Sequence, residues 1–528
     1  MTACAGVGTK PVDGEQGAND IEDHSQPALW PDHLADPARL AAAAPPDLPA
    51  TSPYPSDLWQ RIRSGFVMNG IDHERVAAEL RYYSRHPEFM NRVADRAAPY
   101  LHYIVEEVER RGMPMEVALL PVVESAYQPF AYSHGRAAGI WQFIPGTGKH
   151  YGLQQTWWYD GRRDVIASTD AALNYLDRLQ KMFDGDWQLA FAAYNAGEGT
   201  VSRAIRRNRQ LGRPTDYWSL SLPLETRQYV PRLLAVRALV EDPQVFDIEL
   251  TSIADEPYLR VVDVGSHIDL ALAAELADMA IEDIYRLNPG YNRWATDPDG
   301  PHRLALPLDN AERFILALAE VPENERVRWQ RHRIASGESL GQIARRYGTT
   351  VAVLQEANGI RSHVIRAGDH LIVPASSKPS QHYALSADQR LARNQSRERQ
   401  GKRINHTVQR GDTFWGMSRR YGVQVRELAA WNNMAPGDPL RPGQTLAIWK
   451  QSSGAGGNIT AALTQGDPII QRIRYTVRQG DSLYVIARRF RVSVTELRNW
   501  NNLVEGGYLQ PGQRLVLHVD VRAQSGNI

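Results

Sequence analysis

Apolar residues recur at helical spacing from about residue 58 to about residue 240. In the stretch YLHYIVEEVERRG they fall three or four positions apart, which places them on one face of a helix. The residues on that face are Leu101, Ile104, Val105 and Val108. Gly112 ends the pattern, and Pro114 suits the first turn of a following helix, MEVALLPVVES.

Two later stretches, STDAALNYLDRLQKMF and DWQLAFAAYNAG, show the same spacing. Ala172, Leu176 and Leu179 face inward in the first stretch. The second stretch stops at Gly197, a residue type that commonly ends helices. We therefore expect an all-helical domain over residues 58–245.

Beyond residue 325 the chain repeats itself three times. Each copy has a short run of Val, Thr or Ile, two amphipathic segments and a closing alternating run such as LIV or LVL. This pattern predicts the order strand, helix, helix, strand. Two glycines anchor each copy and lie 31, 32 and 32 residues apart (Gly337 to Gly368, Gly411 to Gly443, and Gly480 to Gly512). We assign the copies to residues 330–376, 404–450 and 473–520.

Polar stretches separate the copies and have the composition of linkers, SSKPSQHYALSADQRLARNQSRERQGKR and QSSGAGGNITAALTQGD. We therefore expect independent small domains on tethers, because the repeats of a solenoid must abut to share a core. Residues 251–322 keep the strand, the helix and the Asn-terminated helix of a copy but lack its Gly-Asp pair. We interpret them as a degenerate fourth copy. The alternative is a helical connector that packs on the preceding domain.

Composition and charge exclude several classes of function. The chain of 528 residues has 60 Lys and Arg against 60 Asp and Glu, so it lacks the basic excess of a nucleic-acid-binding protein. A single cysteine, Cys4, excludes an internal disulfide framework and a multi-cysteine metal site. His134 and His150 have no partner ligands at metal-binding spacing. We expect neither a metal nor any other cofactor.

Residues 1–57 are rich in Ala, Pro, Asp and Gly and have no hydrophobic periodicity, which predicts a disordered tether. Within it, Cys4 lies in MTACAG, which resembles the end of a bacterial lipoprotein signal, where the cysteine is lipidated. The basic and apolar regions that should precede it are missing from this sequence. Either the true start lies upstream, or the match is accidental and the thiol is free. No stretch of about 18 uncharged apolar residues occurs, so we expect membrane attachment only through a lipid on Cys4.

The candidate chemistry centres on one acid in PVVESAYQPFAYSHGRAAGIWQFIPGTG. Glu124 ends an apolar run that includes Leu119, Leu120, Val122 and Val123. Burial among such residues raises the pKa of a carboxyl group and suits it to donate a proton near neutral pH. Most glycosidases use two carboxylates, and here the nearest other acids, at positions 116, 160 and 164, lie outside the motif-rich region.

Four blocks around Glu124 occur in the order found in family 1 lytic transglycosylases, so residues 98–240 resemble the lysozyme-like, all-helical SLT catalytic domain of that family. The blocks are Glu124-Ser125, GIWQF with Gly139 and Gln142, AAYNAG with Tyr194 and Asn195, and ETRQYV with Glu225 and Tyr229. The second block departs from the commoner Gly-Leu-Met-Gln at Ile140-Trp141. Because Gln142 is retained, we expect altered packing and retained activity.

The three copies resemble LysM domains, a small α+β (βααβ) family that binds N-acetylglucosamine polymers in a shallow groove. Copies two and three carry the motif Gly-Asp-Ser/Thr, and copy one has Glu338 in place of the Asp. The resemblance implies that these motifs form one side of the groove, at Gly411, Asp412, Thr413, Gly480, Asp481 and Ser482. The alternative is that these residues only cap the following helix. The multidomain chain as a whole is similar to membrane-bound murein transglycosylases of the D type.

The resemblance implies cleavage of the β-1,4 bond between N-acetylmuramic acid and N-acetylglucosamine in peptidoglycan. Glu124 would protonate the leaving oxygen, and the substrate's own C6 hydroxyl would attack C1, which gives a 1,6-anhydro end and benefits from preset geometry. The residues implied in substrate binding are Ser125, Ser133, Gln142, Tyr194, Asn195, Glu225 and Tyr229. A hydrolytic muramidase of the same fold and a non-catalytic wall-binding scaffold are the alternatives.

We expect the protein to act as a monomer on peptidoglycan strands in the periplasm, anchored to the outer membrane as a lipoprotein, and not on nucleic acid. The aromatic stretch Trp157, Trp158 and Tyr159 offers ring faces that could stack on sugars. Packing in the core is the favoured interpretation for these three residues, because large aromatic side chains usually serve cores.

Overall fold

The computed structural model describes residues 57–68 and 72–450 and, further on, residues 470–477, 481–490, 492, 494–501, 503, 509–510 and 512–520. Cys4, Gly480 and the predicted tether before residue 57 lie outside the described residues, as does the predicted linker between copies two and three. The chain divides into two compact units between residues 451 and 452, and each unit is described by itself.

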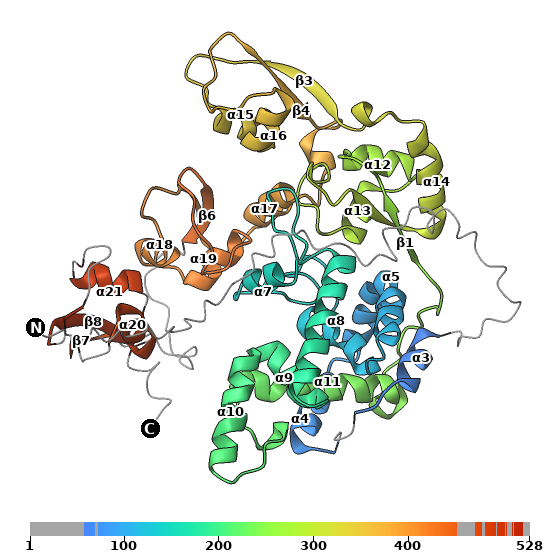
Figure 1. Cartoon of the computed structure of the whole chain (residues 1–528), viewed down its shortest axis with the longest axis vertical. Coiled ribbons are helices and arrows are strands. Elements are labelled where there is room, and N and C mark those ends of the chain that lie inside the picture. Colours follow the sequence, from blue (N-terminus) through green and yellow to red (C-terminus); the bar gives the residue numbers. More distant parts are fainter. Residues whose placement is uncertain are drawn as a thin grey trace, which may run out of the picture. The chain divides into compact units, whose positions relative to one another are not determined.

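The first part of the chain is an all-helical domain (Figure 1), as the periodicity predicts. The long helices α5, α8 and α11 enclose its core, and α11 packs against α4, α6 and α9. The α-helices are α3 (Leu58–Ser64), α4 (Glu74–Tyr83), α5 (Glu88–Arg110), α6 (Leu120–Ser125), α7 (Pro145–His150), α8 (Val165–Met182), α9 (Trp187–Ala196), α10 (Glu198–Gln210) and α11 (Leu224–Glu241). Three 3₁₀ helices join them: η1 (Met115–Leu119), η2 (Tyr217–Ser219) and η3 (Pro243–Phe246).

The inward faces agree with the sequence pattern, but one predicted helix is divided. All the residues predicted to face inward in α5 and α8 are fully buried. The stretch MEVALLPVVES, expected to form one helix, is instead η1 followed by the short α6. The division falls next to Pro121, which has no backbone N–H to continue the hydrogen-bond ladder and is favoured in a first turn. This restart sets the direction of α6, which carries Glu124 at its end.

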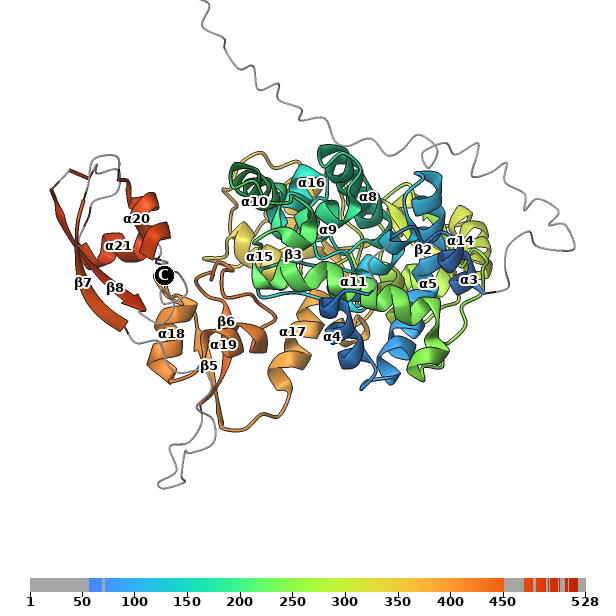
Figure 2. The ribbon, with the colours of Figure 1, turned by 90° about the horizontal axis from the view of Figure 1, so that it is seen from below.

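The remaining domains are four βααβ units, each with one antiparallel pair of strands. Three belong to the first unit and one to the second, in which β7 and β8 lie side by side with α20 and α21 packed beside them (Figure 2). The βααβ domain that directly follows the helical domain has two additional helices at its end, α14 (Leu308–Ala319) and η4 (Glu323–Glu325). In chain order the units comprise β1 (Leu259–Asp263), α12 (Leu270–Leu276), α13 (Ile281–Leu287) and β2 (Arg303–Pro307); β3 (Arg328–Arg333), α15 (Leu340–Arg346), α16 (Val351–Ala357) and β4 (His370–Ala375); β5 (Lys402–Thr407), α18 (Phe414–Tyr421), α19 (Val425–Trp431) and β6 (Thr445–Lys450); and β7 (Ile470–Thr476), α20 (Leu483–Phe490), α21 (Val494–Asn501) and β8 (Arg514–Asp520).

Each of the four βααβ units has an asparagine at the end of its second helix, and this asparagine makes the same hydrogen bonds in all four. Its side-chain nitrogen donates to a carbonyl four residues earlier and to a carbonyl of the closing strand, and its side-chain oxygen accepts the N–H of that same strand residue. These residues are Asn288, Asn358, Asn432 and Asn501. The same three bonds in the unit of Asn288 identify residues 259–307 as a version of the repeat.

The segment between copies one and two is folded, which contradicts its interpretation as a free linker. It forms η5 (Ser380–His382) and α17 (Ala387–Ser396). Tyr383 is buried, and its hydroxyl donates to Asp269 at 2.9 Å in the preceding βααβ unit. Gln395 of α17 donates to Asn432 at 2.7 Å in copy two. The composition is polar because these side chains form hydrogen bonds between domains, so the expectation of separate tethered domains is wrong for the first unit.

Candidate active site

Glu124 is positioned by the sharp end of α6. The helix ends at Ser125, and the following residue, Ala126, has the left-handed conformation φ 50° and ψ 42°. The backbone N–H groups of Ala126 and Tyr127 donate to Val122 and Pro121, and the Tyr127 hydroxyl donates to the Ala118 carbonyl at 2.8 Å. These bonds fix the turn on which the Glu124 carboxyl group is held, partly buried.

Burial raises the pKa of Glu124 to about 7, and the nearby negative charge of Glu225 acts in the same direction. A hydrogen bond from the Tyr229 hydroxyl to Glu124 Oε1, at 2.6 Å, opposes this shift because it stabilises the ionised carboxylate. A carboxyl group with a pKa near 7 can both donate and accept a proton at neutral pH.

Glu124 lines a pocket of about 560 Å³. Residues of α4, α5, α6 and α11 line it, together with Ala126 and Gln128. Two charged lining residues, Glu79 and Arg232, lie outside the four sequence blocks, and they form an ion pair with an N–O distance of 3.4 Å. No local motif marks this pair, because its members are far apart in the sequence and meet only when α4 packs against α11.

The three other acids considered from the sequence all have structural partners. Glu116 is fully buried, forms an ion pair with Arg237 at 3.2 Å and accepts the N–H of Met68. Asp160 forms an ion pair with Arg162 at 2.8 Å. Asp164 caps α8 and forms an ion pair with Arg303 at 2.9 Å. None of the three lines the Glu124 pocket.

The GIWQF block supports α6 from behind. Ser125 Oγ donates to the Ile140 carbonyl at 3.0 Å. Gly139 has φ 78°, and a Cβ there would lie 2.0 Å from the Arg162 carbonyl oxygen, so only glycine fits. The Gln142 side chain donates to the Gly139 carbonyl at 2.7 Å. Trp141 is fully buried and donates to Thr169, so the departure from the commoner motif is accommodated in the core.

The two remaining blocks meet the first two beside Glu124. The Tyr194 hydroxyl donates to the Trp141 carbonyl at 2.9 Å, and the charge of Glu124 contributes to the raised pKa of Tyr194. Asn195 accepts a hydrogen bond from the hydroxyl of Thr226 at 2.8 Å. Thr226 directly follows Glu225, which is exposed. The fold therefore gathers Glu124, Tyr194 and Tyr229 in one place.

Ser133 is the predicted site residue that lies apart from the others. Its hydroxyl accepts the N–H of Ala137 at 3.0 Å, and it lines a second, larger pocket instead of the Glu124 pocket. Two of the three aromatic residues, Trp158 and Tyr159, pack in a core as favoured from the sequence, whereas Trp157 is partly buried and lines the larger pocket. Trp158 and Tyr159 are buried against the first βααβ unit, and the Arg293 guanidinium covers the Trp157 ring at 3.6 Å.

The LysM-like motifs form the turn before the first helix of each copy. Asp412 accepts hydrogen bonds from His406 at 2.7 Å and from the Gln409 N–H at 2.8 Å, and Thr413 caps α18. In copy one Glu338 accepts the equivalent bonds, from His332 and from the Ala335 N–H. The substitution of Glu for Asp therefore keeps the turn. In copy three Asp481 accepts a hydrogen bond from Tyr475, and Ser482 is exposed.

No group of three or more His, Cys, Asp or Glu side chains in the described part of the chain could hold a metal ion. No helix among the described residues is long and apolar enough to cross a membrane.

Comparison with known protein families assigns each domain. Residues 103–216 match the transglycosylase SLT domain. Residues 258–323 match the LysM-like domain of the lytic transglycosylase MltD, in agreement with the interpretation of a degenerate copy. Residues 332–374, 406–449 and 475–517 match the LysM domain.

A match to one group of known proteins covers most of the chain. The membrane-bound lytic murein transglycosylase D of Escherichia coli is 37% identical over 398 residues, which are 73% of this chain and 85% of that protein. A putative tributyltin chloride resistance protein of an Alteromonas species is 53% identical over 119 residues, 22% of this chain and 58% of that protein. The order of domains and the extent of the first match confirm the resemblance noted in the sequence: the chain belongs to the family of membrane-bound lytic murein transglycosylase D.

Proposed function

We propose that this lytic transglycosylase cleaves the β-1,4 bond between N-acetylmuramic acid and N-acetylglucosamine and leaves a 1,6-anhydromuramic acid end. One observation carries the proposal. Glu124 lines a pocket and has a pKa of about 7, and among the described residues the other acid that lines this pocket, Glu79, is ion-paired to Arg232. Glu225, whose charge acts on Glu124, is exposed and does not line the pocket. A hydrolase of the common type would need a second carboxylate to activate water or to attack the sugar.

The reaction needs one acid because the substrate supplies the nucleophile. Protonated Glu124 gives its proton to the glycosidic oxygen as the bond from that oxygen to C1 breaks. The 2-acetamido carbonyl supports the positive charge that develops at C1. The C6 oxygen then bonds to C1, and its proton passes to the Glu124 carboxylate, which restores the acid. No water is consumed, and the intramolecular step benefits from preset geometry.

The neighbours of Glu124 position it and the sugar. The Tyr229 hydroxyl, 2.6 Å from Oε1, stabilises the carboxylate that forms after the first proton transfer. We propose that Tyr194 and Asn195 orient the acetamido group, and that Gln142 and Ser125 hold the turn behind the carboxyl group, which their hydrogen bonds to the GIWQF backbone support. Glu225, whose charge raises the pKa of Glu124, favours the proton-donating form. We propose contact between Ser133 and the substrate only in the neighbouring larger pocket.

The LysM domains bind peptidoglycan and would hold the enzyme on its substrate. We propose that the groove beside α18 uses Gly411, Asp412 and Thr413, and that Gly480, Asp481 and Ser482 serve copy three. The E. coli relative is named as membrane-bound. For this chain we propose a monomer that acts in the periplasm, attached to the outer membrane by a lipid on Cys4.

The experiment that tests this function compares the full-length protein with its E124Q variant on purified sacculi. We expect wild type to release muropeptides with anhydro ends and E124Q to release almost none. The matched control is E312Q, which removes an exposed acid on α14 and should cleave like wild type. Undiminished cleavage by E124Q would remove Glu124 from the mechanism. Products with reducing muramic acid ends would identify the enzyme as a muramidase.

A further inference from the structure

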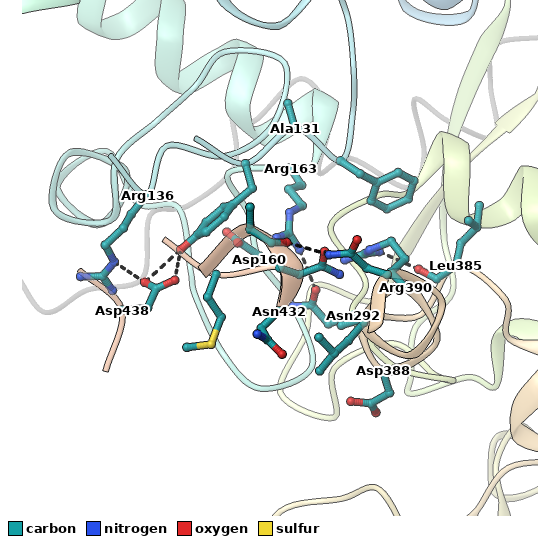
Figure 3. Close-up of a pocket in the computed structure, with 18 of the residues that line it drawn as sticks. Ala131, Arg136, Asp160, Arg163, Asn292, Leu385, Asp388, Arg390, Asn432 and Asp438 are labelled. Atoms are coloured by element: carbon teal, nitrogen blue, oxygen red, sulfur yellow. Dashed lines mark hydrogen bonds and ion pairs between the residues drawn. The ribbon is translucent and has the colours of Figure 1, made fainter. Parts of the chain in front are cut away.

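A second pocket, of about 1360 Å³, lies beside the candidate active site. Five parts of the first unit line it (Figure 3): two loops of the catalytic domain, the turn at Asn292 and Arg293, Arg345 of α15 in LysM copy one, the α17 segment, and the end of α19 with the following loop of LysM copy two. Gln128 lines both this pocket and the Glu124 pocket. The two pockets are therefore neighbours that meet at Gln128.

The second pocket has a large excess of positive charge. Nine arginines line it, against three aspartates. Each aspartate is paired with an arginine of the pocket, at N–O distances of 2.5 to 2.8 Å. Within the part of the chain that the structure describes, the other six arginines have no carboxylate within 4.0 Å: Arg163, Arg345, Arg390, Arg393, Arg397 and Arg441.

Two of these arginines are partly buried. Arg163 donates from Nη1 to Asn292 at 2.9 Å, and its Nε has no hydrogen-bond acceptor (Figure 3). Arg390 donates to the Leu385 carbonyl at 2.6 Å and stacks on the Phe130 ring at 4.3 Å. Burial, together with the charges of Arg163 and Arg293, lowers the pKa of Arg390 to about 9. The positive charges of Arg163 and Arg390 disfavour each other in this partly buried place, and the Asp160 carboxylate that acts against this is already paired with Arg162. A bound anion would lower the cost of holding these charges there.

Contacts within the first unit hold the walls of the pocket together. Asp438 of LysM copy two forms an ion pair with Arg136 at 2.6 Å and accepts the Tyr132 hydroxyl at 3.0 Å, which fixes copy two against the catalytic domain (Figure 3). The backbone N–H of Ala387 donates to the Asn292 carbonyl at 2.8 Å and anchors the start of α17. Preset guanidinium groups bind carboxylates with little ordering cost.

We propose that this arginine-lined pocket binds the carboxylates of the peptide stem that murein carries next to the cleaved bond. The inference rests on the proposed function. The sugars of a murein strand are neutral once the lactyl acid is joined to the stem in an amide bond, so the anionic groups are the carboxylates of the stem. A volume of about 1360 Å³ exceeds the ~300–1,000 Å³ of common small-molecule pockets and suits a short peptide. LysM copy two would then contribute to choosing where the strand is cut.

The first experiment measures cleavage of two substrates by full-length variants. One substrate is glycan strands with their stems, and the other is the same strands stripped of stems by an amidase. R393Q/R397Q removes two exposed arginines, one near the end of α17 and one directly after it, so folding should be unaffected. The control is R206Q, which removes an exposed arginine on α10 that lines neither pocket.

We expect R393Q/R397Q to raise KM on stem-bearing strands about 10-fold with little change in kcat, because each charge-assisted hydrogen bond contributes several-fold to binding. R390Q should act in the same direction, with partial recovery in R390K, which keeps the charge. On stripped strands every variant should match wild type within about twofold. Equal losses on both substrates, or no loss on either, would overturn the inference. In both cases wild type would still form anhydro ends, so failure of the inference is distinct from failure of the proposed function.

The second experiment titrates wild type and R390Q with a free stem peptide, with its fully amidated counterpart and with inorganic phosphate. The carboxylated peptide should bind wild type at least about 10-fold more tightly than the amidated peptide, and R390Q should lose this preference. Equal binding of both peptides, or binding of phosphate as tight as that of the peptide, would show that the pocket does not recognise the stem.

Discussion

The raised pKa of Glu124 predicts that the candidate catalytic acid lowers the stability of its own domain at neutral and higher pH. In the unfolded chain this carboxyl group has a pKa of about 4.5, and in the folded protein it is about 7. Since folding raises the pKa, the folded state favours the protonated form. Stability is therefore greatest below about pH 4.5 as far as this group is concerned, and it falls as the pH rises to 7.

The magnitude follows from the difference between the two pKa values. One pH unit corresponds to about 1.4 kcal/mol, so a difference of about 2.5 gives a loss of about 3 kcal/mol above pH 7. E124Q has a neutral side chain of the same shape and escapes the loss. The free energy of opening should be about equal in E124Q and wild type at pH 4, and about 3 kcal/mol higher in E124Q at pH 8.

The assay is hydrogen exchange of peptides from α5 and α11, which report the opening of the catalytic domain without requiring the whole chain to unfold in one step. The informative quantity is how the difference in opening free energy between E124Q and wild type changes from pH 4 to pH 8. The contributions of all other titrating groups are the same in both proteins and cancel in this difference. E312Q should track wild type at both pH values. If E124Q and wild type differ by a constant amount from pH 4 to pH 8, Glu124 is not desolvated as described and the reasoning fails.

Four further substitutions test the surroundings of Glu124, the Gly139 turn and LysM copy two. Y229F removes the bond that lowers the pKa of Glu124, so the basic limb of the pH profile of kcat/KM should move up by about one pH unit; an unmoved limb would exclude Tyr229 from this role. G139A should destabilise the catalytic domain by more than about 2 kcal/mol, measured by thermal unfolding, because the φ of 78° and the Arg162 carbonyl leave no space for a Cβ. N432A should unfold LysM copy two at lower denaturant, with a loss of about 2–4 kcal/mol, since three buried hydrogen bonds disappear; unchanged exchange in α19 and β6 would contradict this. The backbone bond from Gln409 and the bond from His406 lower the pKa of Asp412, so its stabilising effect is present at neutral pH and is lost in acid. D412N should therefore be less stable than wild type at pH 7, and the gap should close as the pH falls below the folded pKa of Asp412, as followed by exchange in α18.

The sequence predicted those features that depend on local periodicity and on motifs. Spacing of three and four identified the buried faces of α5 and α8, and the four ordered blocks identified Glu124, Tyr194 and Tyr229 as neighbours. Repeat comparison also found the degenerate copy, whose Asn288 makes the same bonds as its counterparts in the other copies.

Features that depend on contacts between distant segments were missed. Glu79 and Arg232 meet only through packing of α4 on α11, and neither stands in a recognisable motif. The α17 segment looks like a linker because its polar residues hydrogen-bond to other domains instead of to water. Pro121 in MEVALLPVVES was a visible signal for the restart of the helix, and the amphipathic pattern masked it.

The central claim is that one proton donor suffices because the substrate closes its own ring. The most direct measurement is cleavage of purified glycan strands in water labelled with heavy oxygen, followed by mass analysis of the new muramic acid ends. Because no water takes part, the new ends should carry no heavy oxygen and should be one water lighter than a hydrolysis product. New ends that contain heavy oxygen as they form would contradict the account.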